Sequence, residues 1–151
     1  MNWIYFNEEH IMLRNMVREF AKNEIKPLAQ DIDKGIFPKE SIDKMAALGL
    51  MGIPWSDKYG GTNMDTLSLV IAIEEIGKVC ASTAATMMAH TSLGTAPIVA
   101  FGTEKQKDKY LPDLVTGRKI GAFGLTEPNA GSDAGNTQTT AVLDGENFYV
   151  N

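Results

Sequence analysis

A short run of hydroxyl, amide and glycine residues near the C-terminal end is the part of this sequence best suited to hold a ligand. Thr126 and Ser132 offer hydroxyls, Asn129 offers an amide, and Gly131 permits close backbone approach. Residues 120–151 contain four acids and no lysine or arginine, so a phosphate bound there has to be held by hydroxyls and backbone N–H groups. The same residue types also build ordinary turns, in which they bond their own backbone.

Composition and residue counts exclude several other kinds of site. With 44% apolar residues the 151-residue chain can fill a core, and its net charge of -5 disfavours binding nucleic acid through phosphates. One cysteine, Cys80, and two distant histidines, His10 and His90, cannot assemble a zinc site. His90 is interpreted as a satisfied helix residue. Gly121 and Gly124 lack the third glycine and following helix of a dinucleotide-binding fold.

We also expect neither a targeting leader nor a membrane-spanning segment. The apolar run 67–73 is far shorter than a membrane span, and Glu8, Glu9 and His10 interrupt any leader near Met1. A single cysteine fits a reducing compartment. We therefore expect a cytoplasmic protein with no membrane segment.

The residues before Lys119 follow a helical period. Apolar residues recur at helical spacing after Asn7, and they predict a buried stripe that comprises Ile11, Met12, Met16, Val17, Phe20, Ala21 and Ile25. We expect a bundle of about six helices. The first runs from Asn7 to a kink or interruption at Pro27, the second from Pro38 to Gly49, and the third, buried on most sides, from Asp65 or Thr66 past Val70 to Ile76. The fourth runs from a Ser82 cap through His90, the fifth carries Pro97 and ends at Gly102, and the sixth runs from a Thr103–Gln106 capping box to Gly117.

After Lys119 the period becomes two-fold, which is typical of a strand. Phe123 and Leu125 alternate with smaller residues and would share one face. Further on, an Asp144-Gly145 pair between two alternating segments predicts a hairpin. Since so few strands cannot bury a face of their own, we expect residues 1–118 to form a helical domain and residues 119–151 to begin a truncated β domain.

Three segments together resemble the FAD-dependent acyl-CoA dehydrogenase family. The most specific is the run from Gly124 to Asp133, GLTEPNAGSD, which is similar to the signature of that family. The others are FGTEKQK from Phe101 with YLP following, and YGG from Tyr59 ahead of a helix that contains two glutamates. The resemblance covers nearly the whole chain and is closest to the short-chain, butyryl-type branch.

The resemblance implies an N-terminal helical domain, a middle β domain and a C-terminal four-helix domain, with FAD between the last two. It assigns roles to seven residues here: Phe123, Leu125 and Thr126 would face the flavin ring, Gly131 and Ser132 would lie near the FAD pyrophosphate with Ser132 also meeting CoA, and Thr86 and Leu93 would line the acyl-chain pocket.

The reaction that the resemblance implies removes the α proton of an acyl-CoA and transfers the β hydrogen as hydride to the flavin, which leaves a trans-2-enoyl-CoA. It requires a carboxylate base and hydrogen bonds to the thioester oxygen. In the family that base is a glutamate from the C-terminal half, so no catalytic residue is expected in this chain, and Glu127 is interpreted as a scaffold residue.

The resemblance further implies an electron-transfer flavoprotein as partner and a homo-oligomer, a tetramer, for the whole protein. We expect the 151-residue polypeptide alone to bind FAD weakly or not at all, and to self-associate. Two alternatives stay open: an acyl-CoA oxidase or flavin monooxygenase of the same fold, and a non-catalytic helical interaction module.

Overall fold

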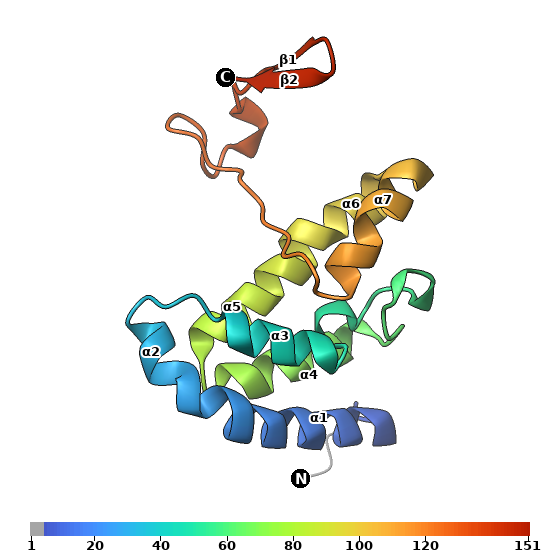
Figure 1. Cartoon of the computed structure of the whole chain (residues 1–151), viewed down its shortest axis with the longest axis vertical. Helices are drawn as coiled ribbons and strands as arrows, with labels where there is room; N and C mark the ends of the chain where they lie inside the picture. The colour runs from blue at the N-terminus through green and yellow to red at the C-terminus, as the bar shows by residue number, and fades with distance from the viewer. Residues whose placement is uncertain (1–4) are drawn as a thin grey trace.

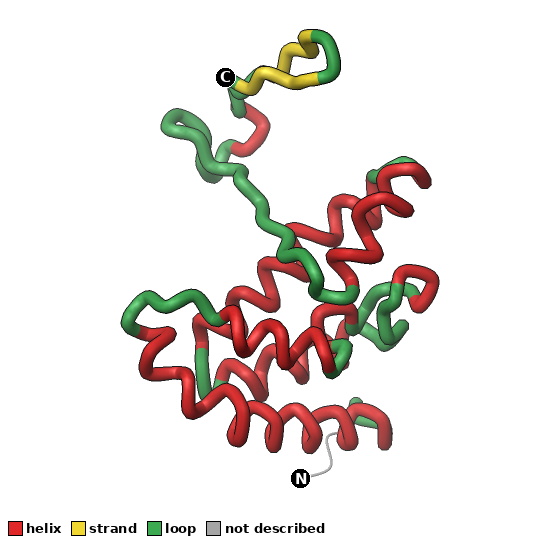
Figure 2. Tube along the Cα trace, viewed as in Figure 1, coloured by secondary structure: helices red, strands yellow, loops and turns green. Residues whose placement is uncertain are grey.

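The computed structural model describes residues 5–151, so expectations about residues 1–4 lie outside the described part. Helices form most of the chain and a small hairpin ends it (Figures 1 and 2). The prediction of a mainly helical fold followed by strands is confirmed. In chain order the elements are α1 (Glu8–Phe20), α2 (Ala29–Asp33), α3 (Lys39–Ala47), α4 (Thr66–Gly77), α5 (Ala81–Met88), α6 (Ala96–Phe101), α7 (Glu104–Val115), β1 (Ala141–Asp144) and β2 (Asn147–Val150).

Most of the predicted helix starts are confirmed. Asn7 and Thr103 each form a capping box, with His10 and Gln106 as the respective partners. Asp65 caps α4 through Ser68 N–H. The predicted Ser82 cap is wrong: α5 begins two residues earlier, with Cys80 at the N-cap position.

One of the breaks predicted between the helices does not occur. In the described residues, α5 continues through a π-helical segment, Ala89–Thr95, into α6 as one uninterrupted rod. The first rod likewise runs from α1 through a π-helical turn and a 3-10 turn at Pro27 into α2. The π-helical segments widen the helix locally instead of ending it. At Pro27, where a kink or an interruption is expected, the helix tightens into a 3-10 turn and then continues into α2.

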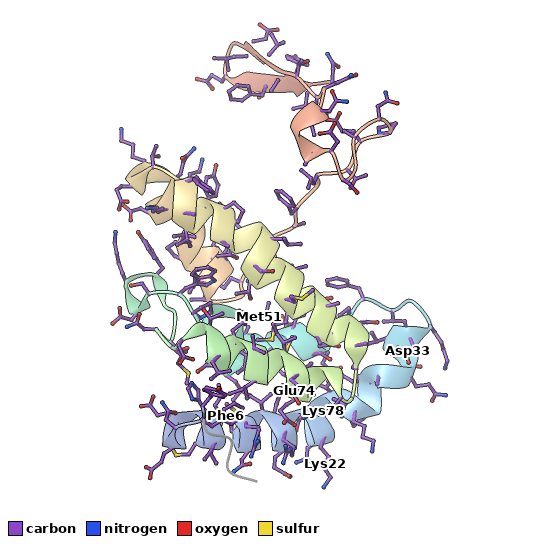
Figure 3. The ribbon with its side chains drawn as sticks, turned by 180° about the vertical axis from the view of Figure 1, so that it is seen from behind. Phe6, Lys22, Asp33, Met51, Glu74 and Lys78 are labelled. Carbon is purple, nitrogen blue, oxygen red and sulfur yellow. The ribbon has the colours of Figure 1, made fainter. Side chains whose placement is uncertain are left out.

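The core lies where α1, α3, α4 and α5 meet, and Figure 3 shows Met51 among these helices. The stripe predicted for α1 is partly wrong. Met12 is 64% exposed and Met16 39%, because α4 packs on the adjacent side of α1 and buries Leu13 and Val17 there. Val70 of α4 is likewise exposed. Within the described residues no helix is long and apolar enough to cross a membrane.

Residues 119–151, the tail, lead away from the helices (Figure 1). The strand predicted after Lys119 is not formed, since a strand needs a hydrogen-bonded neighbour and the described residues supply none for residues 120–126. The hairpin is confirmed, with β1 and β2 antiparallel. Its two-residue loop is Gly145-Glu146, because Asp144 pairs with Asn147. Of the loop residues, Gly145 has positive φ, as a type II′ turn requires.

Candidate functional site

The three residues expected to face a flavin ring lie on the extended first part of the tail. Phe123 is 51% exposed and Leu125 45% exposed, and Thr126 is exposed beside them. This segment presents its side chains freely because no strand or helix within residues 5–151 covers them. An aromatic ring, an isobutyl group and a hydroxyl are thereby available to a flat ligand.

The loop after Thr126 is closed by a side chain that the sequence marked as scaffold. Glu127 pairs with Ala130 through two backbone hydrogen bonds of 2.9 and 3.2 Å. Its carboxylate also accepts hydrogen bonds from the N–H groups of Gln138 at 2.7 Å and Thr139 at 2.9 Å, and from the Thr139 hydroxyl. The Gln138 N–H is the main reason that the pKa of Glu127 lies below its usual value, with the two Thr139 donors adding to it.

The closed loop carries the residues expected near a pyrophosphate. Ser132 is exposed, and no heavy atom lies within 4 Å of a Cβ built on Gly131. A ligand can therefore approach this backbone closely. The donor set consists of hydroxyls and N–H groups without a cationic side chain, and together with exposed Phe123 and Leu125 it fits one side of an FAD molecule.

The two residues expected to line an acyl pocket lie on the rod formed by α5, the π-helical segment and α6. Thr86 is half-buried on α5, and its hydroxyl donates to the Ser82 carbonyl at 2.9 Å. Leu93 is 45% exposed in the π-helical segment. The structure does not gather these two residues and the loop with Ser132 into one enclosed pocket, because the tail leads away from the rod (Figure 1).

The rod and the tail are nevertheless joined at one place. The N–H of Gly121 donates to His90 Nδ1 at 2.9 Å, and His90 Nε2 lies 3.1 Å from the Leu114 carbonyl oxygen. Gly94 touches the same point, since a Cβ built on it would lie 2.6 Å from the carbonyl carbon of Gly121. Two segments that are about thirty residues apart in sequence are therefore fastened together.

The hydrogen bonds of His90 define its protonation. An N–H donor faces Nδ1 and a carbonyl faces Nε2, so the ring is neutral with its proton on Nε2. Burial lowers the pKa of His90, and the bond to Leu114 only partly opposes this. The interpretation of His90 as a satisfied residue is confirmed. Its partnership with Gly121 was not foreseen, since no local pattern links positions so far apart.

Comparison with known proteins gives the chain a family. Residues 7–118 match the model of the acyl-CoA dehydrogenase N-terminal domain. The short-chain specific acyl-CoA dehydrogenase of Clostridium acetobutylicum is 54% identical over 144 residues, which are 95% of this chain and 38% of that protein.

Two solved structures agree. An acyl-CoA dehydrogenase from Bacillus anthracis, complexed with FAD, is 35% identical with a TM-score of 0.89, and the match covers all of this chain and 26% of that one. A chain from the structure of the electron transferring flavoprotein of Acidaminococcus fermentans is 43% identical with a TM-score of 0.91, covering 99% of this chain and 40% of that one. This chain thus spans well under half the length of these relatives. It belongs to the acyl-CoA dehydrogenase family.

Proposed function

We propose that the whole protein is an FAD-dependent acyl-CoA dehydrogenase of the short-chain type, of which residues 1–118 are the helical N-terminal domain and residues 119–151 the start of the β domain. The observation that carries the proposal is the exposed segment from Phe123 to Thr126, followed by the Glu127-closed loop, in a chain of this family. The 54% identical relative with a short-chain name supports the substrate class.

In the proposed function the tail holds one side of the cofactor. FAD, when bound, supplies the acceptor for the hydride that leaves the substrate β carbon. Phe123 and Leu125 cover the ring, and the Thr126 hydroxyl donates to it. Gly131 and Ser132 offer backbone N–H and hydroxyl donors to the phosphates, and Ser132 also contacts the CoA portion of the substrate.

The proton-removing base lies outside this chain in the proposed function. Removal of the weakly acidic α proton needs a free carboxylate at hydrogen-bond distance. Glu127 is unsuited, because both of its oxygens already accept hydrogen bonds from Gln138 and Thr139. The Glu127 carboxylate instead stabilises the closed loop through these hydrogen bonds.

Thr86 and Leu93 are proposed to contact the acyl chain from the helical side. As electron acceptor we propose an electron-transfer flavoprotein, supported by the similarity to a chain in such a structure. Exposed apolar residues such as Phe101, which is 86% exposed, support assembly into a homo-oligomer, proposed as a tetramer. A cytoplasmic location is proposed from the lone, buried Cys80.

The test is to purify the whole protein and to add butyryl-CoA without oxygen. A yellow flavin spectrum that butyryl-CoA bleaches, with dye reduction, is expected for the whole protein. The 151-residue chain alone is expected to retain little or no flavin. Rapid return of the colour in air would favour an oxidase or monooxygenase instead, and a colourless whole protein would favour the helical interaction module.

A further inference from the structure

The contact between His90 and the tail connects the acyl-pocket side of the proposed site to its flavin side. His90 is fully buried, and both ring nitrogens bond to backbone atoms of distant segments. From these contacts we infer that His90 is a positioning residue that sets where the flavin-facing strand stands relative to the acyl-pocket helix. This inference rests on the proposed function.

Only a few residues separate the His90 contact from the acyl-pocket residue on one side and from the flavin-facing residues on the other. Leu93, on the acyl side, is the immediate neighbour of Gly94, whose backbone presses against Gly121. Phe123, on the flavin side, lies two residues after Gly121, within about 7 Å along the chain. A displacement of Gly121 therefore moves Phe123 and the other flavin-facing residues by a similar distance.

The π-helical segment is the device that makes this contact possible. It widens the rod at Ala89–Thr95, and the Thr95 hydroxyl donates to the carbonyl of His90 at 2.8 Å inside the buried turn. His90, Thr91 and Thr95 are all fully buried. The Thr95 hydroxyl thus fixes the backbone of His90, while the His90 imidazole bonds to the backbone of Gly121 and Leu114.

Histidine suits this task because it places an acceptor and a donor at two fixed distances from the backbone. Asparagine can put an oxygen near the position of Nδ1, where it would still accept from Gly121. Glutamine can put an N–H near the position of Nε2, where it would still donate to Leu114. Each replacement keeps one of the two hydrogen bonds. The bond to Gly121 of the tail can therefore be tested separately from the bond to Leu114 of α7.

The first experiment measures amide hydrogen exchange of the whole protein, resolved to single residues by mass spectrometry. In His90→Gln, the Gly121 amide should exchange at least about tenfold faster than in the wild type, since its acceptor is lost. In His90→Asn it should stay within about threefold. His10→Gln is the matched control: His10 is the other buried histidine, also accepts a backbone N–H at Nδ1, and bonds Asp65 away from the tail. It should leave Gly121 unchanged.

The second experiment uses the whole FAD-bound protein with butyryl-CoA. His90→Gln should lower kcat by about 100-fold, the effect of a misplacement of about 1 Å between reacting groups, with KM changed by less than about threefold. His90→Asn should keep both values near the wild type. A merely structural role would lower folding stability and leave the kinetic constants of the folded fraction alike in both variants.

The outcomes are separable. Equal Gly121 exchange in the two variants, or an active whole protein with equal kcat in both, overturns the inference and leaves the proposed function intact. A wild-type whole protein without FAD refutes the proposed function and the positioning role together, while the Gly121 exchange still reports whether His90 holds the tail.

Discussion

The helical part of the chain and the tail differ in how they are held. The helices bury a continuous core of fully enclosed side chains such as Ile25, Met45 and Ile76. Every residue of β1 and β2 is exposed, including Phe148 at 67%. The helices are stabilised by apolar burial and the tail by a few hydrogen bonds. The expected flavin contacts all lie in the weakly held part, so their placement depends on the points where the tail is fastened.

Removing apolar bulk from the core should give the largest effect and the clearest contrast. Leu50 is 1% exposed and Leu143 on β1 is 60% exposed. We expect Leu50→Ala to lower the free energy of unfolding by about 2 to 5 kcal/mol, from lost burial and a residual cavity. Leu143→Ala should change it by less than about 0.5 kcal/mol. Urea denaturation followed by circular dichroism measures both, and equal losses would contradict the comparison.

A methyl group at the junction should come next. In Gly94→Ala the new Cβ would meet backbone atoms of Gly121 at 2.6 to 2.9 Å, so the tail has to move. A net loss of about 1 to 3 kcal/mol is expected from this overpacking. Gly77→Ala is the control, because its Cβ would meet Ala84 at an ordinary 3.6 Å. It should be neutral or slightly stabilising through helix propensity. If the Gly94→Ala protein is as stable as the Gly77→Ala protein, Gly94 and Gly121 do not pack closely together.

The charge at the start of α4 gives a pH-dependent test of the helical part. Hydrogen bonds from Ser68 N–H and hydroxyl, and then from His10, lower the pKa of Asp65 to about 2. Its contribution is therefore present above the unfolded pKa of about 3.9 and lost as pH falls toward 2. Because the side chain is 58% exposed, solvent screening reduces the effect to about 1 kcal/mol.

Asp65→Asn keeps a capping oxygen but removes the charge. Its stability deficit should be largest above pH 4 and should vanish near pH 2, as measured by urea midpoints across that range. A deficit that is independent of pH would show that the cap, and not the ionised carboxylate, supplies the stabilisation.

The smallest global effect is expected in the tail itself. Glu127→Gln removes one of two carboxylate oxygens, so the Gln138 or Thr139 amide should exchange about five- to tenfold faster. Unfolding of the helices should be unaffected. Glu146→Gln, at the hairpin turn, serves as control and should leave both amides as they are. If neither amide responds to Glu127→Gln, the carboxylate does not close the loop.

Local chemistry explains which features could be predicted from the sequence. Capping residues such as Asn7, Asp65 and Thr103 act within one helical turn, so their effects can be predicted from neighbouring residues. The hairpin at Gly145 depends on similarly short-range rules. The side of α1 that is buried depends on how α4 packs against it, and for this reason Met12 was misplaced.

The site could be predicted only in part. The residues of its flavin side stand in one short run, and the family resemblance assigns them roles. The bond between His90 and Gly121 joins positions 31 residues apart. It depends on a π-helical widening that the spacing of apolar residues does not predict. The strand predicted after Lys119 is absent for a different reason: Phe123 and Leu125 alternate with smaller residues, but the described residues contain no neighbouring strand to pair with them.

The most direct test compares hydrogen exchange of the whole protein with FAD bound and with FAD removed. Residues 123–132 are predicted to lose protection when the cofactor leaves, while the amides of α1 and α4 stay as they were. Unchanged exchange at 123–132, with the change located in α1 or α4 instead, would contradict the assignment of the flavin contacts to the tail.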